Sequence, residues 1–284
     1  AANEDEFEFQ FNMAQRESAN AFGDDTMYIE RFVENPRHVE IQIMADGHGN
    51  VVALGERDCS VQRNHQKLIE ESPSPAITEK IRKSMNHDAI LAAKAVGYTN
   101  AGTIEFILDP KGTYYFMEMN TRIQVEHPIT EAVTGVDLVK QQLLIASGQR
   151  LSIKQEDIKL TGHAIECRIN AENPLLDFRP SPGRIKSLFI PGGPGIRVDT
   201  AVYQGYEIPP YYDSMIGKLI VHGKNREEAI AKMTWALSEF IVDGVATNVD
   251  FQLKLIRRPE FLEGNYDNGF LNRTDILADE RSKE

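Results

Sequence analysis

The sequence predicts an α+β protein built from antiparallel hairpins and amphipathic helices. Two hairpin signals and one long helix support this fold class. The hairpins are indicated by runs that favour strands and are joined by turn residues, and the helix by apolar residues three or four positions apart. These three signals lie at 38–54, 101–119 and 78–97.

Each predicted hairpin consists of two strands and a turn. The turn sequence Asp109-Pro110-Lys111-Gly112 is a strong signal, and the loop at 46–50 contains two glycines. A sheet assembled from such hairpins is mixed or antiparallel. The strands are expected at 38–44 and 51–54 in the first hairpin and at 101–108 and 113–119 in the second.

Capping residues and apolar periodicity predict the helices. Asn3 and Glu6 form a capping-box pattern before an apolar periodic segment that ends at Gly23. Asp137 and Asn225 are further N-cap residues. The other helices are expected from 78 to 97, from 137 to 147, at 226–241 and at 247–256.

The second half of the chain is expected to mix strands with helices. A polar connector at 151–160 separates it from the first half. Besides the hairpins, strands are predicted at 27–32, 163–170, 184–190 and 216–222.

Composition excludes several classes of partner. The 284 residues carry a net charge of -12, so nucleic acid and anionic membrane are not expected partners. No apolar run reaches the ~18 residues of a membrane-spanning helix. Two cysteines, Cys59 and Cys167, make no disulfide framework, which predicts a reducing, cytoplasmic location.

Five polar residues at every second position form the most informative pattern. If the segment is a strand, their side chains share one face of a sheet. Two carboxylates, two amides and a guanidinium are suited to holding a cation and an anion together. The alternative is a solvated outer face of the sheet. The residues are Glu118, Asn120, Arg122, Gln124 and Glu126.

The hairpin at 101–119 adds a third carboxylate to this row. Folding it about its turn places Glu105 opposite Glu118, and like charges directly opposed destabilise a sheet. A divalent cation would remove that penalty. With the Asn120 amide, the two acids supply the hard oxygen ligands that Mg²⁺ or Mn²⁺ prefers.

A second cluster, at 56–67, is basic in an otherwise acidic chain. Arginine and lysine form charge-assisted hydrogen bonds to phosphate oxygens, so this segment is expected to bind phosphates. A solvated basic loop is the alternative. The basic residues are Arg57, Arg63, His65 and Lys67.

Five segments resemble the biotin carboxylases, a family of ATP-grasp enzymes. They follow the family's order, and the resemblance reaches from about residue 1 to about residue 271. The chain is most similar to the separate biotin carboxylase subunit of bacterial acetyl-CoA carboxylase. The segments are 37–42, 56–67, 118–127, 162–172 and 210–218.

The resemblance implies an ATP-grasp core with a mixed or antiparallel sheet, followed by the family's C-terminal subdomain. Residues 1–32 would be the end of the ATP lid, 33–150 the core with the metal and bicarbonate site, and 151–284 the C-terminal subdomain. The family's N-terminal domain and most of the lid have no counterpart here. The chain alone is therefore expected to turn over ATP poorly, because the lid excludes water.

The resemblance also implies a role for each matching residue. Glu126 would be the general base toward bicarbonate, and Arg168 would stabilise the biotin enolate, with Arg122 as the third catalytic residue. The nucleotide contacts would be Glu30, Arg31, Phe32, Val33, His38, Gln62 and His65. The bicarbonate contacts would be Lys67, Arg122, Gln124 and Val125, and the metal ligands Glu105, Glu118 and Asn120.

The implied reaction is ATP- and bicarbonate-dependent carboxylation of biotin on a carrier protein through carboxyphosphate. It is the first half-reaction of acetyl-CoA carboxylase in fatty acid synthesis. The implied cofactors are ATP, Mg²⁺ or Mn²⁺, bicarbonate and biotin. The implied partners are the biotin carboxyl carrier protein, carboxyltransferase subunits and a second copy in a homodimer. Alternatives are pyruvate or propionyl-CoA carboxylase, another ATP-grasp ligase joining a carboxylate to an amine, and a non-catalytic assembly fragment.

Overall fold

The computed structural model describes residue 1 and residues 3–278. The chain divides into two compact units, Ala1–Glu34 and Asn35–Glu284. The second unit contains the large sheet and all of the predicted site residues except 30–33.

The first unit consists of a helix and an extended segment. Helix α1 (Glu4–Phe22) begins after Asn3, whose side chain accepts a hydrogen bond from the Glu6 N–H at 3.0 Å, and it ends at Gly23 in the left-handed conformation. The predicted caps are confirmed. The strand predicted at 27–32 is wrong, because no strand among the described residues pairs with this segment.

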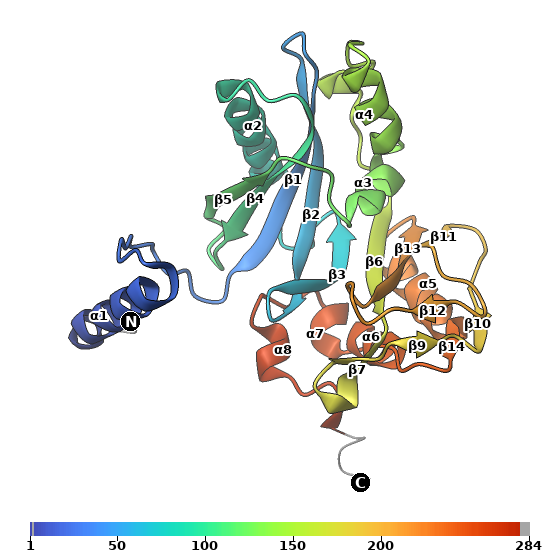
Figure 1. Ribbon diagram of the computed structural model, residues 1–284. Coiled ribbons are helices and arrows are strands. Elements are labelled where there is room, and N and C mark those ends of the chain that lie inside the picture. The colour runs from blue at the N-terminus through green and yellow to red at the C-terminus, as the bar shows by residue number, and fades with distance from the viewer. Residues whose placement is uncertain (2, 279–284) are drawn as a thin grey trace. The chain divides into compact units, whose positions relative to one another are not determined.

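One eight-stranded sheet forms the centre of the second unit (Figure 1). Its strand order is β11-β13-β6-β3-β2-β1-β4-β5, and every neighbouring pair is antiparallel. The sheet therefore joins strands from both halves of the sequence. The strands are β1 (Arg37–Ala45), β2 (Val51–Arg63), β3 (Gln66–Ser72), β4 (Asn100–Leu108), β5 (Tyr114–Asn120), β6 (His163–Asn170), β11 (Ile196–Thr200) and β13 (Met215–Gly223).

Helices and short strands complete the second unit. The short strands pair β10 with β14, β12 with β9 and β7 with β8. They are β7 (Glu172–Asn173), β8 (Arg179–Pro180), β9 (Gly183–Arg184), β10 (Ser187–Phe189), β12 (Glu207–Ile208) and β14 (Ile241–Asp243). The helices are α2 (Glu79–Ala95), α3 (His127–Thr134), α4 (Leu138–Ala146), α5 (Arg226–Glu239), α6 (Val249–Ile256), α7 (Pro259–Leu262) and α8 (Phe270–Arg273), with short 3₁₀ turns at Gln155–Asp157 and Pro174–Leu176.

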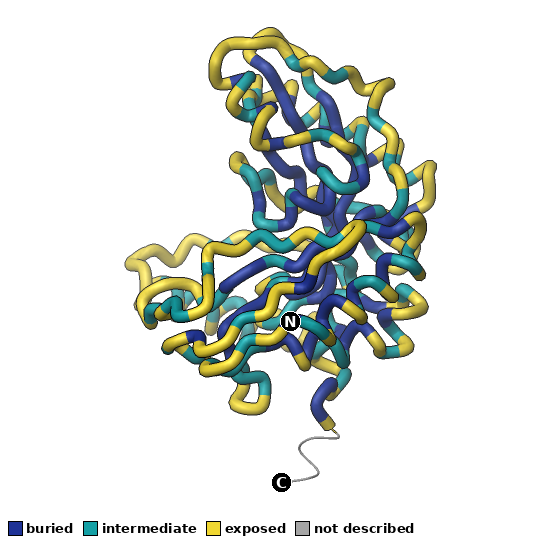
Figure 2. The backbone as a smooth tube through the Cα atoms, turned by 90° about the vertical axis from the view of Figure 1, so that its right-hand side faces the viewer, coloured by how far each residue is buried: buried dark blue, intermediate teal, exposed yellow. Residues whose placement is uncertain are grey.

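Alternation along the strands gives the sheet two faces, and helices cover each of them. On one face Val39, Ile41 and Ile43 of β1 pack against Met85 and Ala89 of α2. Further along this face, β6 and β13 pack against α5 and α6. Buried residues accordingly run along the central strands (Figure 2).

The opposite face is covered by α3 and α4. Ile129 of α3 packs with Ala164 of β6 and Ile220 of β13. Leu138 of α4 packs with Met44 of β1. Between these two apolar contacts lies a band of polar side chains, which forms the candidate site.

The hairpin of β4 and β5 is confirmed, and Glu105 lies opposite Glu118 as predicted. Next to the turn, Phe106 pairs with Phe116, so an unbroken ladder would place Met117 opposite Glu105. A bulge at Met117 shifts the pairing by one residue. The predicted opposition of the two acids therefore depends on this bulge as well as on the turn.

Most other element predictions are confirmed within a few residues, including α2, α4, α5, α6, β6 and β13. Two strand predictions need correction. β2 continues to Arg63, well beyond the predicted end at residue 54, so 56–67 is a strand hairpin and not a loop. The strand predicted at 184–190 is divided between β9 and β10.

Glu71 of β3 connects the sheet to the C-terminal helices. Its carboxylate accepts hydrogen bonds from Arg226 at 2.8 and 3.0 Å and from the Tyr266 hydroxyl, and it lies 2.5 Å from His163 Nε2. Burial alone would raise the pKa of Glu71, but the bonds from His163 and Arg226 lower it to about 2. The ionised carboxylate therefore stabilises this connection at neutral pH.

Within the described part of the chain, no helix has both the length and the apolar character needed to cross a membrane. Cys59 and Cys167 are free and buried. The cytoplasmic location stays a prediction.

Candidate active site

A continuous band of polar side chains lies on the sheet face that α3 covers. On β1, His38, Glu40 and Gln42 point to this face, while the residues between them pack against α2. Glu105 of β4 joins them because it pairs with Glu40 across the ladder. All four side chains are buried.

Arg57 of β2 lies at the centre of this band and is fully buried. Its guanidinium donates hydrogen bonds to Glu40 (2.6 Å), Gln42 (2.6 Å), Gln124 (2.9 Å), Thr130 (3.0 Å) and Thr103 (3.2 Å). A buried guanidinium with its donors engaged by the protein has no access to a phosphate. The interpretation of Arg57 as a phosphate ligand is therefore wrong, and its contacts are structural.

Lys67 of β3 joins three carboxylates. Its ammonium lies 2.7 Å from Glu40 Oε2, 2.6 Å from Glu126 Oε1 and 3.2 Å from Glu105 Oε1. β3 directs Lys67 to this face through a shift at Leu68 in its ladder with β2. A strand bulge therefore sets the direction of this side chain.

The neighbouring cations keep two of these acids ionised. Burial alone would raise the pKa of Glu40, but Arg57 and Lys67 lower it to about 2. Burial has the same effect on Glu105, and contacts with His38 and Lys67 lower its pKa to about 2. Both groups are carboxylates at neutral pH.

The polar row predicted as one strand at 118–126 needs correction. β5 ends at Asn120, and residues 121–126 form bends and turns that lead into α3. The prediction that all five side chains share one face of a strand is therefore wrong. Pro128 in the first turn of α3 disfavours helical conformation in the residue before it, so the chain leaves the sheet before the helix begins.

The turn nevertheless returns part of the row to the site. Gln124 Nε2 donates to Glu105 Oε1 at 2.7 Å and to Asn120 Oδ1 at 2.9 Å. Glu126, 2% exposed, lies just before α3 and also faces the polar band. The turn, rather than strand alternation, brings these two side chains to the acids.

Glu126 is held between two cations. Its Oε1 accepts from Lys67 Nζ at 2.6 Å, and its Oε2 accepts from Arg168 Nη2 at 3.0 Å. Glu70 Oε1 fixes the other side of Arg168, 2.6 Å from its Nε. Burial alone would lower the pKa of Arg168, but Glu70 and Glu126 raise it, so the guanidinium stays charged.

Glu105, Glu118 and Asn120 are linked as a candidate metal site. Asn120 Nδ2 donates to Glu118 Oε1 at 2.6 Å, and the Gln124 amide bridges Asn120 to Glu105. Two carboxylates and an amide oxygen suit a hard divalent cation. Glu118 is exposed, which leaves room for water or substrate oxygens. These residues fit Mg²⁺ or Mn²⁺.

A second acidic group fits a cation less well. One ligand atom each from His38, Glu40 and Glu105 lie within 4.8 Å of one another. The Lys67 ammonium, however, is 2.7 Å from Glu40 and 3.2 Å from Glu105. A cation there would be repelled by this ammonium, so the position beside Glu118 is favoured.

The predicted nucleotide contacts fall in different parts of the structure. His38 Nδ1 lies 2.8 Å from Gln62 Nε2, and His38 Nε2 lies 2.9 Å from Glu105 Oε2. His65 is exposed at the tip of the β2–β3 hairpin, with φ of 63°. Residues 30–33 lie in the extended segment of the first unit. Their roles stay predictions.

Two predicted bicarbonate residues have different surroundings from Lys67 and Gln124. The Val125 carbonyl accepts a hydrogen bond from Lys218 Nζ of β13 at 2.8 Å. Arg122 is exposed, and its Nη1 donates to the Ile123 carbonyl at 3.2 Å. Their roles also stay predictions.

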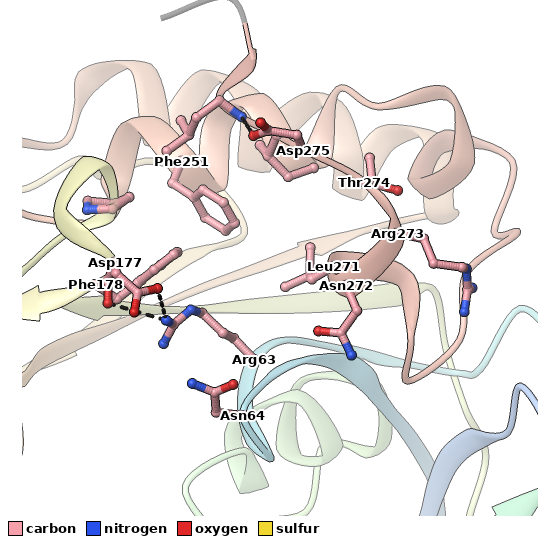
Figure 3. A pocket seen from close by; sticks show the side chains of 13 residues that line it. Arg63, Asn64, Asp177, Phe178, Phe251, Leu271, Asn272, Arg273, Thr274 and Asp275 are labelled. Atoms are coloured by element: carbon pink, nitrogen blue, oxygen red, sulfur yellow. Dashed lines mark hydrogen bonds and ion pairs between the residues drawn. The ribbon is translucent and has the colours of Figure 1, made fainter. Parts of the chain in front are cut away.

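The basic residues of 56–67 do not form one cluster, because strand pairing separates them. Arg63 points away from the polar band and donates to the backbone and side chain of Asp177 (Figure 3). Its guanidinium carbon lies 4.4 Å from the centre of the Phe178 ring. These residues and 271–277 line a separate cavity of about 500 Å³. The predicted phosphate-binding loop is therefore wrong.

Sequence reasoning missed several residues that organise the site. Glu40 had a usable signal, since His38, Glu40 and Gln42 alternate along a predicted strand in the same way as the row at 118–126. Lys218 had none, because only the pairing of β13 with β6 brings it to Val125.

Comparisons with known proteins agree with this arrangement. Residues 1–154 match the family model of the carbamoyl-phosphate synthase L chain ATP-binding domain, and residues 166–273 match the biotin carboxylase C-terminal domain. Biotin carboxylase 1 of Bacillus subtilis (strain 168) is 57% identical over 98% of this chain. The chain spans 62% of the length of that relative.

Two solved structures have the same fold. The biotin carboxylase domain of a thermophilic 2-oxoglutarate carboxylase, bound to bicarbonate, has a TM-score of 0.93 and 48% identity, over 95% of this chain and 61% of that one. The corresponding domain dimer from Hydrogenobacter thermophilus, with MgADP, ADP and bicarbonate, has a TM-score of 0.89 and 48% identity, over 95% and 60%.

The large antiparallel sheet, with its acid and amide ligands on one face, is that of an ATP-grasp protein. Within that class, the chain belongs to the biotin carboxylase family.

Proposed function

We propose that the protein carboxylates biotin on a carrier protein, using ATP and bicarbonate. A bicarbonate oxygen bonds to the γ-phosphorus of ATP, and ADP leaves. The resulting carboxyphosphate divides into CO₂ and phosphate. The biotin N1 nitrogen, after losing its proton, bonds to the CO₂ carbon.

The observation that carries this proposal is the position of Glu126 between Lys67 and Arg168. A carboxylate within hydrogen-bond reach of bicarbonate can take its proton. Lys67 would offset the negative charge of bicarbonate as it approaches the γ-phosphate. Arg168 would stabilise the biotin enolate oxygen, since a guanidinium stays charged at any working pH.

We propose that Glu105, Glu118 and Asn120 hold Mg²⁺ or Mn²⁺. The bound cation would spread the negative charge of the ATP phosphates. Gln124 would keep two of the ligands oriented, because its amide donates to both Glu105 and Asn120. The MgADP complex of the Hydrogenobacter domain supports this assignment.

The nucleotide and bicarbonate contacts belong to the same proposal. The nucleotide would be bound by residues 30–33, His38, Gln62 and His65. Bicarbonate would be bound by Lys67, Arg122, Gln124 and the backbone of Val125. The support is that related domains are described as complexes with ADP and bicarbonate.

The assembly is also a proposal. A biotin carboxyl carrier protein, carboxyltransferase subunits and a second copy of the chain would be its partners. A related structure is described as a domain dimer, which supports the homodimer. Acetyl-CoA is the proposed final acceptor, because the Bacillus relative, at 57% identity, is named for biotin carboxylation alone, whereas the 2-oxoglutarate carboxylase domains are 48% identical.

We retain three parts in this proposal: a lid segment at 1–32, a core at 33–150 and a C-terminal subdomain at 151–284. The two family matches meet between residues 154 and 166, which supports a division near 150. We also propose that these 284 residues alone turn over ATP slowly, since they span 62% of the Bacillus relative and lid closure excludes water.

A chimera tests the proposed reaction. The 284 residues replace the matching segment of the Bacillus protein, and ADP formation is measured with bicarbonate and free biotin. We expect a rate that requires bicarbonate and rises with biotin. Glu126→Gln should lower it about 100-fold or more, because it removes the general base. Glu263→Gln, at an exposed position outside the site, is the control and should leave the rate unchanged.

Other outcomes would favour other functions. ADP formation that depends on an amine acceptor and ignores biotin would indicate a carboxylate–amine ligase. A chimera that binds no nucleotide by calorimetry would indicate an assembly role. A rate for the isolated chain equal to that of the chimera would refute the proposed slow turnover.

A further inference from the structure

Two fully buried glutamates lie beside Arg168 and have no part in the proposed reaction. Glu70 of β3 and Glu166 of β6 are direct partners across the ladder, and both are 0% exposed. Directly opposed like charges destabilise a sheet, and no bulk water screens them at this depth. The pair therefore requires either a cation or a proton.

The hydrogen bonds indicate which of these is present. Glu70 Oε1 accepts from Arg168 Nε at 2.6 Å. Among the described residues, Glu70 Oε2 and both oxygens of Glu166 have no hydrogen-bond partner. Burying an ionised carboxylate without a donor is very unfavourable. A protonated Glu166, in contrast, has an acceptor across the ladder in Glu70.

The nearby cations are engaged elsewhere. Lys67 contacts Glu40, Glu105 and Glu126, and Lys218 contacts the Val125 carbonyl and Asp199. Burial is the largest cause that raises the pKa of Glu70, to about 7, and it raises the pKa of Glu166 well above its usual value. The charged groups that act on the pair are Arg168, Lys67, Lys218 and Glu126. Burial also raises the pKa of the nearby Cys59 and Cys167 thiols, which stay neutral.

We propose that Glu70 and Glu166 share one proton, so that the pair carries a single negative charge and Glu70 anchors Arg168 against Glu126. Glu70 is then a positioning residue, since it acts on the reaction through Arg168. A second negative charge in the pair would compete with Glu126 for the guanidinium. The positioning role depends on the proposed function, whereas the shared proton does not.

Glu166→Gln in this chain tests the shared proton. Above about pH 5 the unfolded chain has released both protons, but the native pair retains one, so wild-type stability falls as pH rises. The amide removes that penalty. We expect the variant's Tm to gain on the wild type by about 3–5 °C for each pH unit between about pH 5 and pH 7. A Tm difference that stays constant or reverses with pH would overturn the proposal.

Two further measurements keep the result interpretable. The wild type should show an infrared carboxylic-acid C=O band at pH 7 that Glu166→Gln lacks, and absence of this wild-type band would contradict the shared proton. Glu71→Gln is the matched control, since Glu71 is the adjacent buried glutamate but is fully paired on the other face. Its Tm difference from the wild type should stay constant between about pH 5 and pH 7, because its pKa is about 2.

The positioning role is tested in the chimera. Glu70→Gln should lower biotin-dependent ADP formation about tenfold and leave the biotin-independent rate largely unchanged, a loss of about 1.4 kcal/mol of transition-state stabilisation. Equal loss of both rates, or loss of neither, would overturn the positioning role. A chimera that is inactive before mutation would sink the proposed function, while a positive Tm result would still establish the shared proton.

Discussion

Replacing Arg57 by methionine tests whether the polar band depends on one buried cation. Methionine preserves much of the aliphatic volume but donates no hydrogen bond. Glu40 would lose its partner at 2.6 Å and keep only Lys67. The amide oxygens of Gln42 and Gln124 would each lose a donor as well.

The expected magnitude follows from these losses. Breaking one side of a buried ion pair costs about 3–5 kcal/mol. Each buried amide oxygen left without its donor adds about 1 kcal/mol. Thr103 and Thr130 add little, because their hydroxyl groups can rotate to donate elsewhere. Arg57→Met should therefore reduce the free energy of unfolding by about 5 kcal/mol, which corresponds to a Tm lower by about 10–20 °C.

Urea unfolding of this chain measures the change, followed by the fluorescence of its single tryptophan, Trp235 on α5. Arg57→Lys is the control for charge, and it should be less destabilised because it retains a cation near Glu40. Combining Arg57→Met with Glu40→Gln should show a coupling energy of at least about 1 kcal/mol. A loss below about 1 kcal/mol for Arg57→Met, or strict additivity, would refute this account of the band.

Three further substitutions test other contacts. Glu71→Gln should reduce stability by about 3 kcal/mol at pH 7, because its pKa is about 2 when folded against 4.5 when unfolded, and the loss should shrink as pH falls below about 4.5. Urea unfolding at pH 7 and pH 3 measures this, and equal losses would contradict it. Lys218→Met should raise the KM for bicarbonate of the chimera about tenfold with kcat nearly unchanged, since it releases the Val125 carbonyl, and steady-state kinetics showing only a fall in kcat would count against it. Gly162→Ala should be at least about 2 kcal/mol less stable than Gly97→Ala in urea unfolding. Both positions have positive φ, but only at Gly162 would a Cβ lie 2.3 Å from a backbone oxygen, that of Gly223, and similar losses would argue against this packing.

The sequence was sufficient for features that arise from neighbouring residues. Asn3, Thr78, Asp137 and Asn225 cap helices where expected, because a cap is a contact within three residues. The Asp109–Gly112 turn likewise determined the β4–β5 hairpin and brought Glu105 near Glu118. The resemblance of long motifs then supplied the family, which the comparisons confirm.

The sequence was misleading where a strand pattern continued past the end of a strand. The alternation from Glu118 to Glu126 suggested one pleated segment, but β5 ends at Asn120 and the chain turns into α3. Gln124 and Glu126 reach the site through that turn. Periodicity reports local preference, whereas the end of a strand depends on whether a neighbouring strand continues beside it.

Sequence alone determined the fold class, the helix caps, the acidic hairpin and the family of this protein. Only the tertiary structure decided that Lys67 faces Glu126, that Arg57 is enclosed and that Glu70 opposes Glu166. The physical reason is that capping and turn formation are set by residues a few positions apart. Ladder shifts and the pairing of buried charges depend instead on strands distant in sequence, whose register is chosen by packing of the whole sheet.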